Sequence, residues 1–175
     1  MRTIIRLTIS YVPWIIYWTL CAIGSRNGGI WALGISLLLL IYNILTKHIS
    51  YLYTVSLGYF IVTIIVTNLL KTDILIIGDG YYGYGYLAIV SIISFLIKKP
   101  FMNYYILYSC QENELEQCSK WINIIWISVF IISMLIFYYI KVPMIAVLKS
   151  NFFVLLGIIL TLIILKNKIQ MECDV

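Results

Sequence analysis

Residues 98–126 have the sequence KKPFMNYYILYSCQENELEQCSKWINIIW, which is the only long polar interruption of an otherwise apolar chain. Of the 175 residues of the chain, 63% are hydrophobic and 11% are charged. A soluble domain has about 25% charged residues, and a chain of this length cannot hide such an excess of apolar side chains in a water-soluble core. The sequence therefore predicts an integral membrane protein with a single domain over residues 1–175.

The apolar segments on either side of this interruption predict helices, because they continue over roughly 17–24 residues without the alternation of a barrel strand. We expect an all-α, polytopic transmembrane helix bundle of about six membrane helices, with about five as the alternative. The expected spans are residues 8–24, 30–46, 51–70, 86–97, 121–140 and 152–165. Residues 78–86, which are rich in Gly and Tyr, are expected to form an irregular turn before the fourth span.

The basic residues lie singly or in pairs at the ends of the apolar segments, which indicates membrane topology and not nucleic-acid binding. The expected spans place Arg2, Arg6, Lys47, Lys98, Lys99, Lys120, Lys166 and Lys168 on the side of the N-terminus, and Arg26, Lys71, Lys141 and Lys149 on the other. Because Lys and Arg are enriched in cytoplasmic loops, both termini and a loop over residues 98–120 are expected in the cytoplasm, beneath a bacterial inner membrane.

This central loop is the predicted partner-binding region. Residues 101–108 are expected to lie in the membrane interface, and the acidic segment after them is expected to be solvated. The simpler interpretation is a surface loop without a specific role, and the more specific one is a docking site for a partner protein. The candidate partner-binding residues are Lys98, Lys99, Pro100, Glu112, Glu114, Glu116, Trp121, Asn123 and Trp126. The expected partners are membrane lipid, other inner-membrane proteins and a second copy of the chain, without nucleic acid.

Residues 78–83 (GDGYYG) match the pattern G-x-G-x-x-G. A dinucleotide loop needs a βαβ unit around it, and this segment lies at the non-cytoplasmic mouth of a membrane helix, so the simpler interpretation is a turn with interfacial tyrosines. Because broken helices at membrane depth often mark binding sites, an entrance for a small solute is the alternative. Its candidate residues are Trp31, Asp79, Tyr81, Tyr82, Tyr84 and Tyr86.

The sequence offers little for catalysis. We find no Ser/His/Asp set, no H-E-x-x-H motif and no paired carboxylates within a span, so we predict neither an enzyme nor a bound cofactor or metal. His48 is the only histidine, and the four cysteines are expected to be free thiols. No ionisable residue falls clearly in the middle of a span, which argues against secondary active transport.

Three separated segments follow one pattern: residues 11–18 (YVPWIIYW), residues 98–101 (KKPF) followed by Trp121, Asn123 and Trp126, and residues 151–157 (NFFVLLG). Together they resemble the intracellular septation protein A family of small bacterial inner-membrane proteins. The chain departs from that family at Ile9 and Ser10, where an acidic residue usually precedes the first helix's proline. The resemblance implies a protein of cell-envelope maintenance and division, and it supplies no active-site residues.

Two functions are therefore expected. The first is a non-enzymatic, multi-pass inner-membrane protein of the envelope or septum that acts through membrane partners. The alternative is a small-solute carrier, such as the substrate-binding membrane subunit of a vitamin transporter, which needs about six helices and no charge relay of its own. An aromatic outer mouth would suit a flat ring, although Ala22 is the only alanine in the first span and no Ala-x-x-x-Ala docking face is present there.

Overall fold

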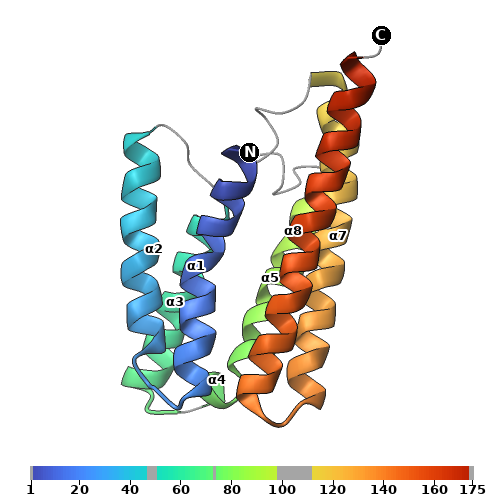
Figure 1. Ribbon diagram of the computed structural model, residues 1–175. Coiled ribbons are helices and arrows are strands. Elements are labelled where there is room, and N and C mark those ends of the chain that lie inside the picture. The colour runs from blue at the N-terminus through green and yellow to red at the C-terminus, as the bar shows by residue number, and fades with distance from the viewer. Residues whose placement is uncertain (1, 47–50, 73, 98–111, 174–175) are drawn as a thin grey trace.

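The structure is a computed structural model that describes residues 2–46, 51–72, 74–97 and 112–173 (Figure 1). Within these ranges the protein is an all-α bundle without a strand, as predicted. The long helices are α1 (Arg2–Ala22), α2 (Gly28–Leu45), α3 (Tyr51–Ile64), α5 (Asp79–Leu96), α7 (Glu112–Tyr139) and α8 (Pro143–Cys173). A π-helical segment, η1 (Ile65–Leu69), continues α3, and the single turn α4 (Ile74–Ile77) precedes α5.

The helices form two groups of three. In the first group α2 packs against both α1 and α3, and in the second α7 packs against both α5 and α8. The groups meet where α1 packs against α8, whereas α3 and α5 make little direct contact. The first residues of α1 and the last residues of α8 lie at the same end of the bundle, which we call the terminal end; the opposite one is the distal end (Figure 1).

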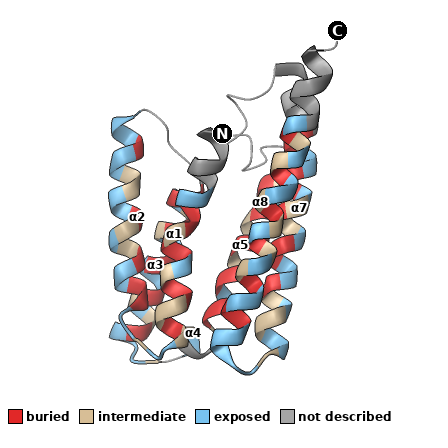
Figure 2. Ribbon diagram, in the orientation of Figure 1, coloured by how far each residue is buried: buried red, intermediate tan, exposed pale blue. Residues whose placement is uncertain are grey.

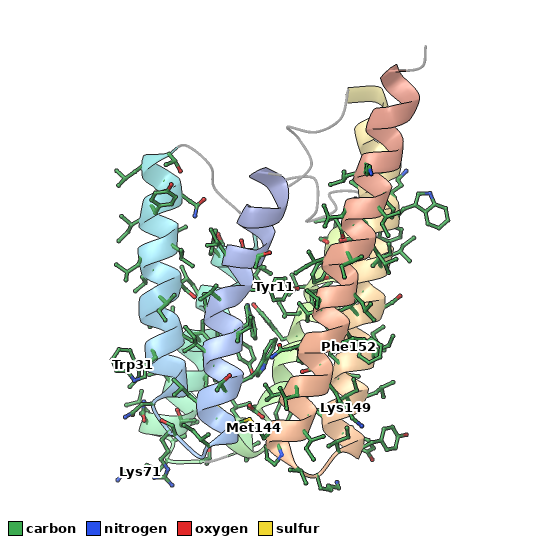
Figure 3. The ribbon with its side chains drawn as sticks, viewed as in Figure 1. Tyr11, Trp31, Lys71, Met144, Lys149 and Phe152 are labelled. Carbon is green, nitrogen blue, oxygen red and sulfur yellow. The ribbon has the colours of Figure 1, made fainter. Side chains whose placement is uncertain are left out.

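Four segments are long and apolar enough to cross a membrane: Gly28–Leu45, Leu52–Leu69, Cys118–Tyr139 and Pro143–Lys166. The protein is therefore a membrane protein, and large apolar side chains such as Leu38, Leu45 and Leu148 lie exposed where lipid would cover them (Figures 2 and 3). Among the described helices, α1 and α5 do not meet this criterion. They carry many of the aromatic and polar residues of the bundle interior.

The largest buried side chains are aromatic and belong to both groups of helices. Those with almost no exposed surface are Trp14, Trp18, Trp126, Tyr11, Tyr17, Tyr84, Phe60 and Phe130. Three small residues spaced four apart on α2, Gly28, Ala32 and Ser36, are all buried. A methyl group on Gly28 would lie 3.1 Å from the Sγ atom of Cys21, so this face lets α2 approach α1 closely.

The irregular turn predicted over residues 78–86 is wrong, because α5 begins at Asp79 and is helical throughout this segment. Glycine disfavours a helix by about 1 kcal/mol per residue, but tertiary packing overrides that preference. A methyl group on Gly80 would overlap the ring of Phe137, and one on Gly83 would lie 2.9 Å from Trp18 Nε1. The glycines therefore allow the large rings of α1 and α7 to pack directly on the backbone of α5.

Two other boundaries differ from the expected ones. Helix α7 begins at Glu112, within the segment predicted as a loop, so the acidic residues fall in its first turns, where their charge complements the helix dipole. Helix α8 begins at Pro143 and extends well beyond the expected span. Proline suits the first position of a helix, since no intrahelical bond is lost there.

Candidate functional site

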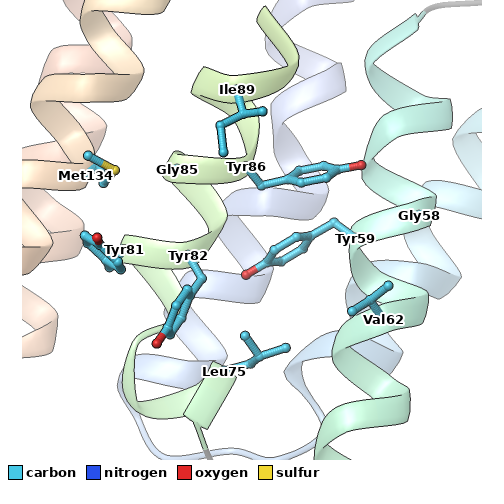
Figure 4. A pocket seen from close by; sticks show the side chains of 10 residues that line it. All are labelled: Gly58, Tyr59, Val62, Leu75, Tyr81, Tyr82, Gly85, Tyr86, Ile89 and Met134. Atoms are coloured by element: carbon cyan, nitrogen blue, oxygen red, sulfur yellow. The ribbon is translucent and has the colours of Figure 1, made fainter. Parts of the chain in front are cut away.

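A cavity of about 570 Å³ lies where α3 and α5 separate (Figure 4). Four tyrosines line it: Tyr59 of α3 and Tyr81, Tyr82 and Tyr86 of α5. Leu75 of α4, Met134 of α7 and the aliphatic side chains of Val62 and Ile89 complete the wall, together with Gly58 and Gly85. Ligand pockets have volumes of about 300–1,000 Å³ and mostly apolar walls with a few polar groups, and this cavity fits that description.

Helix periodicity explains why these side chains meet. Tyr82, Gly85, Tyr86 and Ile89 recur at the i, i+3, i+4 and i+7 positions of α5, which form one face of a helix. Two glycines, Gly58 on α3 and Gly85 on α5, contribute no side chain, so space remains between the rings.

The tyrosine rings of the cavity are held in place by contacts with one another and with the backbone. The centroids of the Tyr59 and Tyr86 rings are 5.3 Å apart, and the Tyr86 hydroxyl donates a 3.2 Å hydrogen bond to the carbonyl oxygen of Val55. The rings of Tyr81 and Tyr82 meet edge to face, with centroids 5.4 Å apart. Such rings can stack on a flat apolar molecule while their hydroxyls select its polar edges.

A second feature lies on the inner side of Tyr59. We define the inner polar cluster as Trp18, Tyr59, Asp79 and Tyr84, which are all buried. Four of its polar atoms make no hydrogen bond of normal geometry: Trp18 Nε1, Tyr59 Oη, Asp79 Oδ2 and Tyr84 Oη. The hydroxyl of Tyr59 has that of Tyr17 beside it, and the hydroxyl of Tyr84 has those of Ser133 and Ser150 beside it. Buried polar atoms without hydrogen bonds are rare, and Trp18 Nε1 and Asp79 Oδ2 have none.

The predicted entrance residues divide into three groups. Tyr81, Tyr82 and Tyr86 line the cavity together. Asp79 and Tyr84 lie instead in the inner polar cluster, at 4% and 0% exposure. Trp31 is on the outer surface of α2, with 63% of its surface exposed, and does not line the cavity (Figure 3).

The predicted partner-binding residues are also dispersed. Lys98, Lys99 and Pro100 lie outside the described residues, as does the expected interfacial segment 101–108. Glu112, Glu114 and Glu116 belong to α7, but their side chains are likewise outside the description.

The other three partner-binding candidates lie further along α7. Trp121 is exposed, whereas Asn123 and Trp126 are fully buried. Asn123 Nδ2 donates to the carbonyl oxygen of Ser91 on α5 at 3.3 Å, and Trp126 Nε1 donates to Thr161 Oγ1 on α8 at 3.1 Å. These two residues join α7 to its neighbours, so of the three only Trp121 lies exposed at the surface.

Sequence reasoning missed the contribution of α3 to the cavity. Gly58 and Tyr59 form on α3 the same Gly-Tyr dipeptide that occurs three times on α5, at residues 80–81, 83–84 and 85–86. This repeated dipeptide was the available signal, because a glycine beside a tyrosine in two apolar helices provides space and a ring at once. Leu75 and Met134 carry no comparable signal.

No protein-family model matches the chain, and comparisons with curated proteins and with solved structures found no significant match. The function must therefore be inferred from the cavity and the cluster themselves.

Proposed function

We propose that this membrane protein binds a small solute with a flat, largely apolar ring and acts as a carrier, such as the substrate-binding membrane subunit of a transporter. The observation that carries this proposal is the cavity of about 570 Å³ between α3 and α5, in which four tyrosines converge. The cavity is large enough for a ring of vitamin size.

Native mass spectrometry of the full chain, released gently from detergent, tests this proposal. We expect a retained molecule of a few hundred daltons, in line with the size of molecule that such pockets enclose. The variant Gly58→Phe should lose this mass, because the new ring would extend from a wall of the cavity.

Gly34→Phe is the matched control for that variant. Gly34 is also an exposed helical glycine, on α2, and a methyl group there would have no atom within 4 Å. This control should keep the retained mass. Wild-type protein that carries no small molecule, or Gly58→Phe protein that carries it unchanged, would contradict the carrier proposal.

A second candidate is an envelope or septum protein that acts through membrane partners. The resemblance of three segments to the intracellular septation protein A family supports it, and so does Trp121, which is 60% exposed on α7. Exposed tryptophans are enriched both at protein interfaces and at the membrane surface. Under this candidate, native mass spectrometry should show clean protein, or protein with lipid, a second copy or another membrane polypeptide attached.

For either function we propose a bacterial inner membrane with the terminal end of the bundle in the cytoplasm. The support is the distribution of Lys and Arg, of which Lys71, Lys141, Lys149 and Arg26 are the only four expected on the distal side.

A further inference from the structure

Asp79 is an acidic residue buried in the bundle. It is the first residue of α5 and is only 4% exposed. Asp79 and Gly83 are four residues apart and therefore share one face of the helix. This face meets α1 and α3, because a methyl group on Gly83 would lie 2.9 Å from Trp18 Nε1 and 3.5 Å from Tyr59 Oη.

The carboxylate of Asp79 lacks a cationic partner among the described side chains. Its Oδ2 atom accepts no hydrogen bond, and its electrostatic neighbours are Tyr17, Cys21, Tyr59 and Tyr84, none of which is a cation. Every Lys and Arg side chain whose burial the structure describes is exposed. The backbone N–H of Gly80 and the N-terminal dipole of α5 offset part of the cost of burying this charge, but a buried carboxyl group either pairs with a cation or takes up a proton.

The neighbours of Asp79 are those of an ammonium site. Three of them are tyrosines: Tyr17 from α1, Tyr59 from α3 and Tyr84 from α5. The ring centroids of Tyr17 and Tyr59 are 5.7 Å apart, with the two planes nearly perpendicular. A carboxylate supplies the opposite charge for an ammonium group, and tyrosine hydroxyls beside it can accept the N–H hydrogen bonds of that group.

Tyr59 and Leu75 connect this cluster to the cavity. Tyr59 belongs to both, since its ring lines the cavity while its hydroxyl approaches Gly83 on the Asp79 face of α5 (Figure 4). Leu75 also lines the cavity, and its carbonyl oxygen accepts a 3.2 Å hydrogen bond from the Tyr17 hydroxyl. Tyr59 and Leu75 are therefore shared by the wall of the cavity and the surroundings of Asp79.

We infer that the solute is an organic cation, a protonated amine or a positively charged heteroaromatic ring, and that Asp79 and the tyrosines beside it hold its charge. This inference rests on the proposed carrier function and adds the chemical class of the solute. It assigns Asp79 a binding role in addition to its place at the start of α5, and it gives Oδ2 the partner that it lacks.

Equilibrium dialysis of the full chain in lipid nanodiscs tests this inference with two probes of matched size, phenethylammonium and neutral 2-phenylethanol. We expect saturable binding of phenethylammonium, tighter than that of 2-phenylethanol. Binding of the cation should fall by about tenfold or more in Asp79→Asn, because one partner of a buried charge pair is removed. Asp79→Glu, which keeps the charge, should retain most of the binding.

Equal binding of phenethylammonium by the wild type and Asp79→Asn would overturn the inference, as would the absence of saturable binding to the wild type. If Asp79→Asn does not fold, the comparison of the two probes on the wild-type protein decides, and equal affinity for both overturns it. A neutral or anionic molecule retained in native mass spectrometry overturns the cation inference and leaves the carrier function standing. The absence of both a retained molecule and probe binding overturns both proposals.

Discussion

Trp18 of α1 is stacked on Tyr84 of α5, with ring centroids 4.0 Å apart and ring planes 17° from parallel. Both side chains are fully buried, and they come from different groups of three helices. Behind Tyr84 the contact continues to Phe130 and Phe137 of α7, at centroid distances of 6.5 and 5.8 Å. This series of rings is therefore a main connection between the two halves of the bundle.

Removing the stacked indole should destabilise the protein strongly. Truncation of a large buried aromatic side chain to alanine costs about 3–5 kcal/mol, through lost contacts and the resulting cavity, and we expect Trp18→Ala to fall in this range. Trp31→Ala is the control, because 63% of the Trp31 surface is exposed. Thermal unfolding in detergent, followed by circular dichroism, should show a clearly lower melting temperature for Trp18→Ala and little change for the control. Equal shifts for both variants would show that the stack does not hold the halves together.

Ser56→Ala should destabilise the contact between α1 and α3. Trp14 Nε1 donates a 2.7 Å hydrogen bond to Ser56 Oγ, and both groups are buried. The substitution leaves the indole N–H without its acceptor, which costs about 1–3 kcal/mol in general and about 0.6 kcal/mol on average between membrane helices. We therefore expect the free energy of unfolding to fall by about 0.6–3 kcal/mol in the same assay.

Ser128→Ala is the control for Ser56→Ala, because Ser128 is exposed and its hydroxyl bonds only to the carbonyl oxygen of Ile124 in its own helix. This variant should unfold as the wild type does. A stability loss in Ser128→Ala as large as that in Ser56→Ala would argue against the interhelical bond.

Gly80→Ala should destabilise the pair α5–α7, although alanine is the better helix former. The added methyl group would overlap the ring of Phe137, which must then move. Overpacking of this kind typically costs about 1–3 kcal/mol. Gly34→Ala is the control, since a methyl group there meets no atom within 4 Å and should leave stability unchanged or raise it slightly. Rescue of Gly80→Ala by Phe137→Leu would confirm the cause, and a neutral Gly80→Ala would contradict it.

Composition and periodicity predict the bundle but not its interior. Long apolar runs lead to helices in lipid whatever their detailed sequence, so the helical class and most of the spans follow from residue content alone. The prediction of an irregular turn over residues 78–86 was wrong because it relied on the local propensity of the glycines and tyrosines. Their helical state depends on Phe137 and Trp18, which are distant in the sequence and reach α5 only in the folded protein.

The candidate site was predictable only in part for the same reason. Tyr81, Tyr82 and Tyr86 could be selected because they cluster in sequence, and they do share the cavity. Their partner Tyr59 lies on another helix, and a chain of isoleucines, leucines and tyrosines does not indicate which helix faces which. Helix periodicity separates Tyr84 from Tyr82 and Tyr86, but it places Asp79 on the same face as these two residues, three and seven positions away, so the burial of Asp79 could not be predicted in this way.

Two tryptophans should report contact with lipid. Trp31 and Trp121 are 63% and 60% exposed, whereas Trp14, Trp18 and Trp126 are fully buried. In bilayers that contain brominated phospholipids, bromine should therefore quench mainly the fluorescence of Trp31 and Trp121. The double variant Trp31→Phe/Trp121→Phe should lose most of the fraction of emission that bromine quenches. If the quenched fraction stays unchanged, these faces of α2 and α7 are not covered by lipid.

The proposed orientation predicts opposite labelling of the two ends of the bundle. Two lysines are exposed at the distal end: Lys71, between η1 and α4, and Lys141, between α7 and α8. Thr46 is exposed directly after α2, at the terminal end. With a membrane-impermeant maleimide on intact cells, Lys71→Cys and Lys141→Cys should react, and Thr46→Cys should react only after permeabilisation. The wild-type chain is the blank for its own cysteines, of which Cys21 and Cys118 are buried. The reverse pattern would place the terminal end outside the cell, against the distribution of basic residues.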